Sequence, residues 1–401
     1  MTAFSVLVVA AGAARTEDAS AGQAPAAASA LGGALAGGNR GPDGLPVSPA
    51  TARPRAVAAR PAHAYYVNCS TGRDTGSGAA TQPWRSLTPV DNTVFPEDSG
   101  VYLARGCIWN AMLKISGVPD TDKGVLITAY GSGSRPMISG AGRSDPSAVA
   151  LLSDHMELTG VAVTGAAQYG IQMFGAHDVV QDVQVSDSGT GVRAKGAGDV
   201  IDNVQVRDLH MIVNIPTPET NYGAVGFDVE AADVEVADSS CTRCRAPSDN
   251  YGFDGGFAEI WDHGDDLYLH GNLASDTEGF IEIGGLGPGI SARHVRIEGN
   301  TMTDVHDGAI FVHDNDDFAI PTADILMSGN RITNHAPSSL PLLGGYLGSL
   351  DLVDNTVLAD QPIALSAPER HTGNTFSVPG ASSVGFPLMP SETLEPLSAT
   401  R

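Results

Sequence analysis

The chain is short of basic residues, aromatic residues and long apolar segments, and these shortages exclude several classes of protein. Its 401 residues include 22 Lys and Arg, of which three are Lys, against 46 Asp and Glu, so the formal net charge is −24. Binding to nucleic acid or to an anionic membrane surface needs clustered basic side chains, and we expect neither partner. The longest apolar run, residues 6–14, falls well below the roughly 18 residues of a membrane-spanning helix. We therefore expect no membrane insertion.

The first 63 residues differ in composition from the rest of the chain. The apolar segment 6–14 is short for a signal peptide and has no Lys or Arg before it. The stretch that follows is rich in Ala, Gly, Pro and Arg and has no periodicity. We interpret residues 1–63 as a weak or truncated signal followed by a disordered leader, and we expect a secreted or extracellular protein. Nothing in the sequence sets an oligomeric state.

Cysteine is scarce, with four residues in the chain: Cys69, Cys107, Cys241 and Cys244. An even number is consistent with two disulfides in an oxidising compartment. The Cys241-Thr-Arg-Cys244 segment could instead be a redox motif or half of a zinc site. A zinc site would need a second ligand pair of suitable spacing, and a redox motif would need a strand–helix setting, so structural disulfides are the preferred interpretation.

Glycine and proline are abundant, at 48 and 25 residues, and this argues against a helical bundle. From about residue 125 the chain instead repeats short runs of alternating apolar residues, most of them opened by Gly. The two shortest intervals, from Gly170 to Gly191 and from Phe257 to Gly279, are 21 and 22 residues. These intervals indicate a basic coil of that length, with insertions in the other coils.

A second register of the same repeat carries Asn at a fixed place. Its members are Asn272, Asn300, Asn330, Asn355 and Asn374. We expect each of these residues to lie at a corner, where Asn tolerates left-handed backbone and its amide can hydrogen-bond to the Asn above and below.

These patterns predict an all-β protein, a single-stranded right-handed parallel β-helix of about nine or ten coils. One coil of three short strands cannot bury its inner face alone, but coils stacked about 4.8 Å apart can. We place an opening segment and N-terminal cap at 64–124, the β-helix at 125–378 and a C-terminal tail at 379–401. A β-propeller would need longer blades, and a leucine-rich solenoid would need a Leu pattern that the chain lacks.

Four segments near the start of the predicted β-helix carry a family resemblance. They are Tyr65-Tyr-Val-Asn, Gln82-Pro-Trp-Arg-Ser-Leu, Val101-Tyr-Leu-Ala-Arg-Gly and Ile127-Thr-Ala-Tyr-Gly-Ser-Gly-Ser-Arg-Pro-Met-Ile-Ser-Gly. Their order resembles the start of secreted right-handed parallel β-helix proteins of the pectate-lyase-like superfamily, over roughly residues 64–378. The resemblance implies the fold but no single reaction, because the group holds pectate and alginate lyases, glycoside hydrolases, epimerases and non-catalytic adhesins. The motifs of polygalacturonase-type hydrolases do not occur in their usual order, so no residue role is carried over.

Residues between the inward-facing apolar positions are expected on the exterior, in columns that run from coil to coil. The first predicted column is Gln172, Arg193, Asp228, Glu259, Glu282 and Phe311. The second is Phe174, Lys195, Glu230, Trp261, Gly284 and His313.

Three carboxylates on consecutive coils, Asp228, Glu259 and Glu282, are the catalytic candidates. Aligned like charges repel, so a surface selected only for stability would avoid them. Glycoside hydrolysis needs two carboxyl groups at about 5–5.5 Å for retention or 6.5–9.5 Å for inversion, close to the spacings of adjacent and next-but-one coils. Candidate substrate-binding residues are Arg193, Lys195, Glu230, Asp254, Trp261, Phe311 and His313. The alternative is plain ion pairing across coils, with Arg193 next to Asp228 and Lys195 next to Glu230.

Two long insertions, at about 209–224 and 241–256, precede the strands that carry Asp228 and Glu259. Long loops in a compact solenoid are commonly functional, and we expect these two to wall an exterior substrate groove. Asp254, at the edge of the second insertion, could reach the groove or could be a turn residue.

Three functions fit these patterns. The leading hypothesis is a secreted enzyme that hydrolyses a polysaccharide or oligosaccharide and requires no cofactor. The second is a Ca²⁺-assisted polysaccharide lyase acting on a uronate polymer, in which Asp228, Glu230 and Glu259 would hold the ion and Arg193 or Lys195 would take the proton. The third is a non-catalytic surface or adhesion protein.

Overall fold

The computed structural model describes residues 61–118, 123–142, 144–216, 221–285, 291–312, 322–335, 343–345, 349–364 and 368–397. The leader predicted at 1–63 lies almost wholly outside these ranges. In the ranges that are described, no helix is long and apolar enough to cross a membrane.

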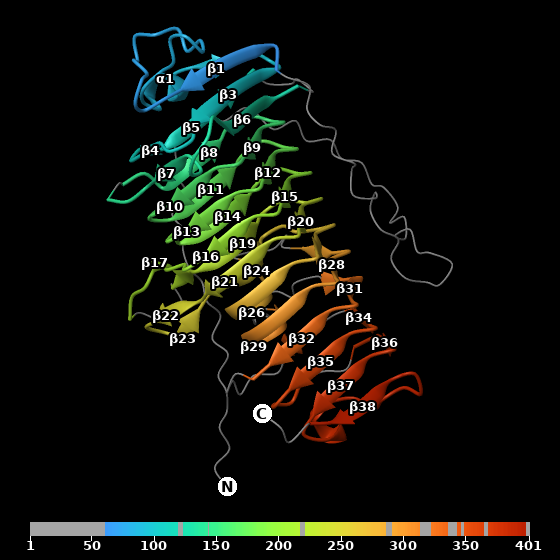
Figure 1. Cartoon of the computed structure of the whole chain (residues 1–401). Helices are drawn as coiled ribbons and strands as arrows, with labels where there is room; N and C mark the ends of the chain where they lie inside the picture. The colour runs from blue at the N-terminus through green and yellow to red at the C-terminus, as the bar shows by residue number, and fades with distance from the viewer. Residues whose placement is uncertain are drawn as a thin grey trace, which may run out of the picture.

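The chain winds into a solenoid whose strands form three faces (Figure 1). The first face is a parallel sheet of twelve strands. Its strands are β1 (His63–Val67), β3 (Ser99–Ala104), β6 (Val125–Tyr130), β9 (Glu157–Thr159), β12 (Val179–Gln181), β15 (Val200–Asp202), β20 (Glu235–Ala237), β25 (Tyr268–His270), β28 (Arg296–Glu298), β31 (Ile325–Ser328), β34 (Leu350–Val353) and β36 (Arg370–Thr372).

The other two faces belong to one sheet of twenty strands, because β26 (Leu273–Gly284) and β29 (Thr301–Val312) each turn the corner between them. The second face holds the starts of β26 and β29 with β4 (Ile108–Trp109), β7 (Met137–Ser139), β10 (Ala162–Thr164), β13 (Gln184–Ser186), β16 (Gln205–Arg207), β21 (Ser240–Cys244), β32 (Arg331–Asn334), β35 (Thr356–Ala359), β37 (Thr375–Val378) and β38 (Thr393–Pro396). The third face holds the ends of β26 and β29 with β2 (Val94–Phe95), β5 (Leu113–Gly117), β8 (Ser147–Leu151), β11 (Tyr169–Met173), β14 (Thr190–Ala194), β19 (Val225–Val229), β24 (Gly256–Trp261) and β33 (Leu343–Gly345).

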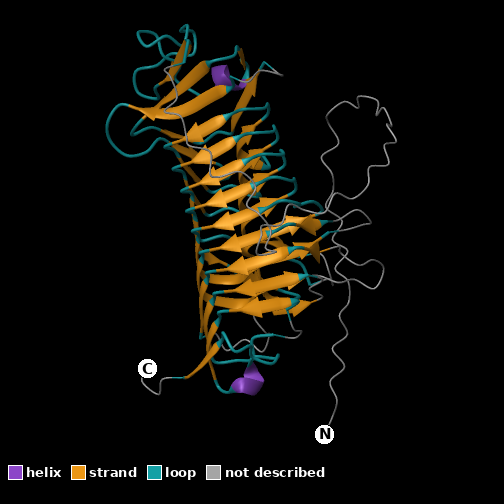
Figure 2. Ribbon diagram, turned by 90° about the vertical axis from the view of Figure 1, so that its right-hand side faces the viewer, coloured by secondary structure: helices purple, strands orange, loops and turns teal. Residues whose placement is uncertain are grey.

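The predicted fold is confirmed as a right-handed parallel β-helix. Ten strands of the first face, β6 to β36, fall within 125–378, which agrees with the predicted nine or ten coils. The opening segment adds β1 and β3 to the same sheet, and β38 of the tail pairs with β37. Figure 2 shows the strands stacked along the axis, with the short helices α1 (Thr88–Asp91) and η1 (Ala381–Ser383) at opposite ends. The boundaries between cap, helix and tail stay a prediction.

Apolar side chains of all three faces fill the interior of the solenoid, as the alternation predicts. Beneath the third face, the rings of Phe227, Phe257 and Phe280 stack on consecutive coils at centroid distances of 4.9 and 4.7 Å. All three side chains are fully buried. This aromatic stack supports the strands that carry the candidate carboxylates, because each coil contacts only its neighbours.

The Asn ladder is confirmed, but the expected backbone conformation is wrong. Asn300 donates its amide to Asn330 at 3.0 Å, and Asn330 donates to Asn355 at 2.9 Å. The left-handed residue of each corner is the one before the Asn, which is Gly in four coils and Asp354 in the fifth. Glycine takes the strained position, since it lacks the Cβ that makes left-handed backbone costly. The following Asn is thereby free to point inward.

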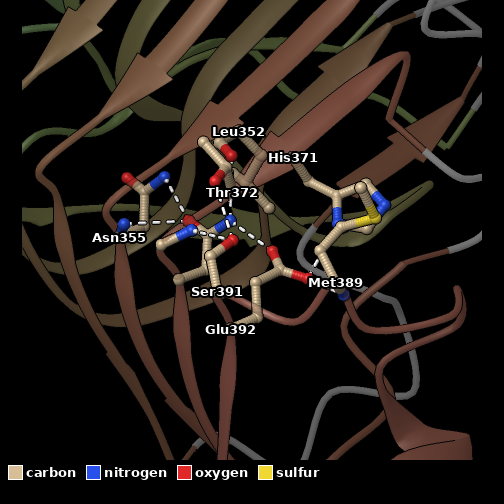
Figure 3. A network of polar contacts seen from close by, with 9 residues as sticks. Leu352, Asn355, His371, Thr372, Met389, Ser391 and Glu392 are labelled. Atoms are coloured by element: carbon tan, nitrogen blue, oxygen red, sulfur yellow. Dashed lines mark hydrogen bonds and ion pairs between the residues drawn. The ribbon is translucent and has the colours of Figure 1, made fainter.

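A buried carboxylate ends this ladder at the C-terminal tail (Figure 3). Glu392 accepts hydrogen bonds from the Asn374 amide at 2.7 Å and from the Met389 backbone N–H at 2.9 Å. The His371 ring nitrogen Nδ1 lies 2.8 Å from Oε2, the oxygen that also accepts the Met389 N–H. The tail therefore satisfies the last amide of the stack.

Both predicted disulfides are present, Cys69–Cys107 and Cys241–Cys244. The first joins the loop after β1 to the loop before β4, and the second lies within β21. Both residues lie within strand β21, without the strand–helix setting of a redox motif, and the disulfide leaves no free thiols for zinc, so the structural interpretation is preferred.

Candidate functional site

The first predicted column lies on the third face in the predicted order. Strand pairing sets Arg193 opposite Asp228, Asp228 opposite Glu259, and Glu259 opposite Glu282. The pairing continues from Gln172 to Arg193 at one end and from Glu282 to Phe311 at the other. Three carboxylates therefore occupy consecutive coils of one face.

The second column is confirmed wherever its residues are described. The Lys195 N–H donates to Met173 and the Glu230 N–H to Ala194, which places Lys195 beside Phe174 and Glu230 beside Lys195. Trp261 pairs with Gly284. His313, predicted to continue this column, lies outside the described residues, as do the acidic residues that follow it.

The carboxylates are less exposed than the alternation alone suggests. Asp228 is 1% exposed and Glu259 is 7% exposed, while Glu282 is half-buried. The neighbours of Asp228 in its strand, Phe227 and Val229, are buried in the core, so its own side chain points away from the core. The expectation of a solvent-facing Asp228 is wrong, because other side chains, Arg193 among them, pack over it.

Arg193 joins the two columns. Its Nε lies 3.4 Å from a carboxylate oxygen of Asp228 and 2.8 Å from Oε1 of Glu230. Its guanidinium stacks on the Tyr169 ring, with 4.6 Å between Cζ and the ring centroid. Burial works against the charge on Arg193, but Asp228 and Glu230 outweigh it and raise the pKa of Arg193 above its usual value. Arg193 is therefore a permanently charged clamp.

Lys195 completes this cluster from the exposed side, with its Nζ 3.1 Å from Glu230. The predicted ion pairs of Arg193 with Asp228 and of Lys195 with Glu230 are both confirmed. The sequence analysis did not predict the contact of Arg193 with Glu230 or its stacking on the Tyr169 ring. Tyr169 opens the strand that carries Gln172, and an aromatic residue one coil away from a buried Arg is a signal that could have identified it.

The two insertions contain short antiparallel hairpins at one edge of the solenoid (Figure 1), and the second starts later than predicted, because Cys241–Cys244 belongs to strand β21 of the second face. The first contains β17 (Met211–Val213) and β18 (Tyr222–Gly223), and the second contains β22 (Ala246–Ser248) and β23 (Gly252–Asp254). The buried amide of Asn221 joins them, with hydrogen bonds to Asn214 at 3.0 Å and Ser248 at 3.2 Å. The hairpins thus support each other beside the strands of Asp228 and Glu259.

Asp254 is a residue of this second hairpin and belongs to neither column. It pairs with Ala246 across the hairpin, and its side chain accepts the N–H of Gly255 at 2.7 Å. Asp254 therefore lies in a strand and not in a turn, and its place in the groove stays a prediction. Trp261 and Phe311, by contrast, are half-buried and lie next to the carboxylate coils.

The predicted calcium ligands do not form a ligand set. Within the described ranges, no group of three or more His, Cys, Asp or Glu side chains is arranged to hold a metal ion. Between Asp228 and Glu230 the positive group is the Arg193 guanidinium. The arrangement of these described residues therefore does not favour the predicted Ca²⁺ site, and the metal requirement stays a prediction.

Comparison with known proteins shows similarity in fold. No protein-family model matches the chain, and no curated protein matches it in sequence. A rhamnogalacturonan lyase structure matches with a TM-score of 0.51 at 15% identity, over 78% of this chain and 87% of the other. The structure of XylC in complex with xylose matches with a TM-score of 0.51 at 8% identity, over 78% and 74%.

The tailspike protein of E. coli bacteriophage HK620, in complex with a pentasaccharide, matches with a TM-score of 0.50 at 10% identity, over 75% of this chain and 55% of the other. At these identities the similarity establishes the fold and not the reaction. The chain therefore has the right-handed parallel β-helix fold, as its repeat pattern predicts.

Proposed function

We propose that this protein is a secreted enzyme that hydrolyses glycosidic bonds in a polysaccharide, with the carboxylates of its third face as acid and base. The observation that carries the proposal is the in-register stack of Asp228, Glu259 and Glu282 on three adjacent strands. Adjacent strands are about 4.8 Å apart, which suits the separation of a carboxyl pair in glycoside hydrolysis. The two disulfides and the carbohydrate-binding β-helix proteins of similar fold support secretion and a saccharide substrate.

Burial divides the roles within the stack. Glu259 is the more buried carboxyl group of the adjacent pair and is the proposed acid that protonates the leaving glycosidic oxygen. Glu282 is more exposed and adjacent, so it is the proposed base that takes a proton from water, or the nucleophile that attacks the sugar. Asp228, which Arg193 holds at 3.4 Å, is the proposed positioning group beside Glu259.

A polysaccharide lyase is the second candidate, and the Arg193 contacts count against one form of it. A lyase needs a base that removes a proton from the sugar. The raised pKa of Arg193 and its two carboxylate partners make it unsuited to that step. Lys195, which is exposed, is the remaining candidate base for a lyase.

A polysaccharide panel tests the proposal. Rhamnogalacturonan, pectate, alginate and xylan are incubated with the protein, with and without a chelator, and both new reducing ends and the ultraviolet absorbance of unsaturated uronates are measured. New reducing ends without that absorbance support hydrolysis. Absorbance that a chelator abolishes favours the Ca²⁺-assisted lyase. Binding without any cleavage, unchanged in Glu259→Gln, favours the adhesion protein.

A further inference from the structure

Two large apolar side chains continue the second column beyond the charged cluster. The Phe174 N–H donates to Leu151 and the Lys195 N–H to Met173, both at 2.9 Å, which places Leu152, Phe174 and Lys195 side by side on three consecutive coils. Leu152 is 42% exposed and Phe174 is 44% exposed, although Leu151 and Met173, the residues before them, are fully buried. We call Leu152 and Phe174 the apolar strip.

The stability of the fold does not account for the apolar strip. Single exposed apolar residues are common on protein surfaces and need no explanation. Here Leu152 and Phe174 are adjacent in register on one sheet face. The next two residues of the same column are the charged Lys195 and Glu230. An apolar patch with a polar border is the arrangement found at ligand-binding grooves, and this one borders the charged cluster of the third face.

We infer that the apolar strip is an outlying subsite, on which the apolar face of a sugar ring in the polysaccharide stacks while the chain lies along the solenoid axis. The inference rests on the proposed function. Aromatic rings such as Phe174 offer a flat apolar surface for such stacking, and Lys195, on the next coil, can donate a hydrogen bond to a sugar hydroxyl. Continuity with the carboxylate stack is what selects a saccharide as the occupant.

The distance between the strip and the carboxylates determines what the subsite does. Three strand pairings separate the coil of Phe174 from the coil of Glu259, which is about 14 Å at about 4.8 Å per strand. A saccharide that reaches both must contain several sugars. The enzyme is therefore expected to prefer long chains and to cleave them internally, since the strip holds sugars on one side of the bond that breaks.

The test measures Phe174→Ala and Leu152→Ser on rhamnogalacturonan, pectate, alginate and xylan and on size-graded oligosaccharides of each. Binding is measured by affinity electrophoresis, with Glu259→Gln as the background so that the polymer is not degraded, and kcat/KM is measured with Glu259 intact. We expect Phe174→Ala to weaken binding and kcat/KM for long chains about tenfold, the loss of one aromatic stacking contact and its buried area. The shortest oligosaccharides that are cleaved should show no change.

Leu273→Ser is the matched control, because Leu273 is also 44% exposed but lies on the second face. Thermal unfolding confirms that each variant is folded. Equal effects on long and short chains, or equal effects of Leu152→Ser and Leu273→Ser, would overturn the subsite while leaving the proposed hydrolase intact. Strip-dependent binding without cleavage would support the subsite and remove the hydrolase. If the Glu259→Gln protein with Leu152 and Phe174 intact binds none of the four polymers, the subsite is contradicted as well.

Discussion

Two groups of acidic side chains occupy consecutive coils of this solenoid, and they differ in what contacts them. In the turn between the third and first faces, Asp178 and Asp199 are fully buried and accept backbone hydrogen bonds. Asp178 accepts the N–H of Met156 at 2.8 Å, and Asp199 accepts the N–H of Asp178 at 2.9 Å. On the third face, a charged side chain, Arg193, contacts Asp228.

The electrostatics of the two groups differ accordingly. Burial raises the pKa of Asp178 to about 8 and, with the nearby Asp178, that of Asp199 to about 9. The turn therefore holds protonated carboxyl groups at neutral pH, in the way that the other corner holds neutral Asn side chains. On the third face the guanidinium of Arg193 favours ionised partners. The two groups thus differ in their surroundings: backbone N–H groups contact Asp178 and Asp199 in the turn, whereas a guanidinium contacts Asp228 on the third face.

The largest expected effect is on catalysis by the third-face stack. Glu259→Gln and Glu282→Gln should each lower the rate of polysaccharide cleavage by at least about 100-fold, because each removes a proposed proton-transfer group. Glu157→Gln, on the first face, is the matched control and should leave the rate unchanged. Rates are measured as reducing ends released, with thermal unfolding as the check on folding. A normal rate in both Glu259→Gln and Glu282→Gln would contradict the proposed role of the third-face carboxylates.

The second effect is on stability and concerns the clamp. Arg193→Met leaves Asp228 and Glu230 without their shared guanidinium and should lower the free energy of unfolding by about 3 kcal/mol. Lys195→Met removes a more exposed partner of the same Glu230 and should cost less than about 1 kcal/mol. Urea unfolding gives both values. If both variants lose a similar free energy of unfolding, the contacts of Arg193 contribute no more than an ordinary surface ion pair.

The third effect is the pH dependence of stability that Asp178 causes, in the turn between the third and first faces. The folded pKa of Asp178 is raised above its unfolded value of 3.8, so the stability that protonation supplies is complete below about pH 4 and is lost as the pH rises through about 8. Asp178→Asn keeps the acceptor for Met156 but cannot ionise. As the pH rises from 6 to 8, the free energy of unfolding of Asp178→Asn should therefore increase by about 2 kcal/mol relative to that of the wild type. Urea unfolding at each pH measures this difference. Parallel pH profiles for the two proteins would show that Asp178 is ionised in the folded state.

Alternation and the Gly-opened repeat were sufficient to predict the fold and the alignment of both columns, because strand side chains alternate strictly and coils stack in register. The burial of Asp228 was missed, although the cross-coil contact with Arg193 that contributes to it was predicted. The Asp178 and Asp199 pair was missed, although each Asp precedes a valine-rich strand at a spacing of 21 residues. The left-handed corner was assigned to Asn instead of the preceding Gly, because both residues tolerate that backbone.

The most direct test of the central claim follows the oxygen atom of water. Cleavage is run in heavy-oxygen water on whichever panel polysaccharide yields new ends, and the products are weighed by mass spectrometry. Hydrolysis by Glu259 and Glu282 predicts one solvent oxygen in each new reducing end, and loss of these products in Glu259→Gln. Unsaturated products without solvent oxygen, or the same labelled products at the same rate in Glu259→Gln, would contradict the account.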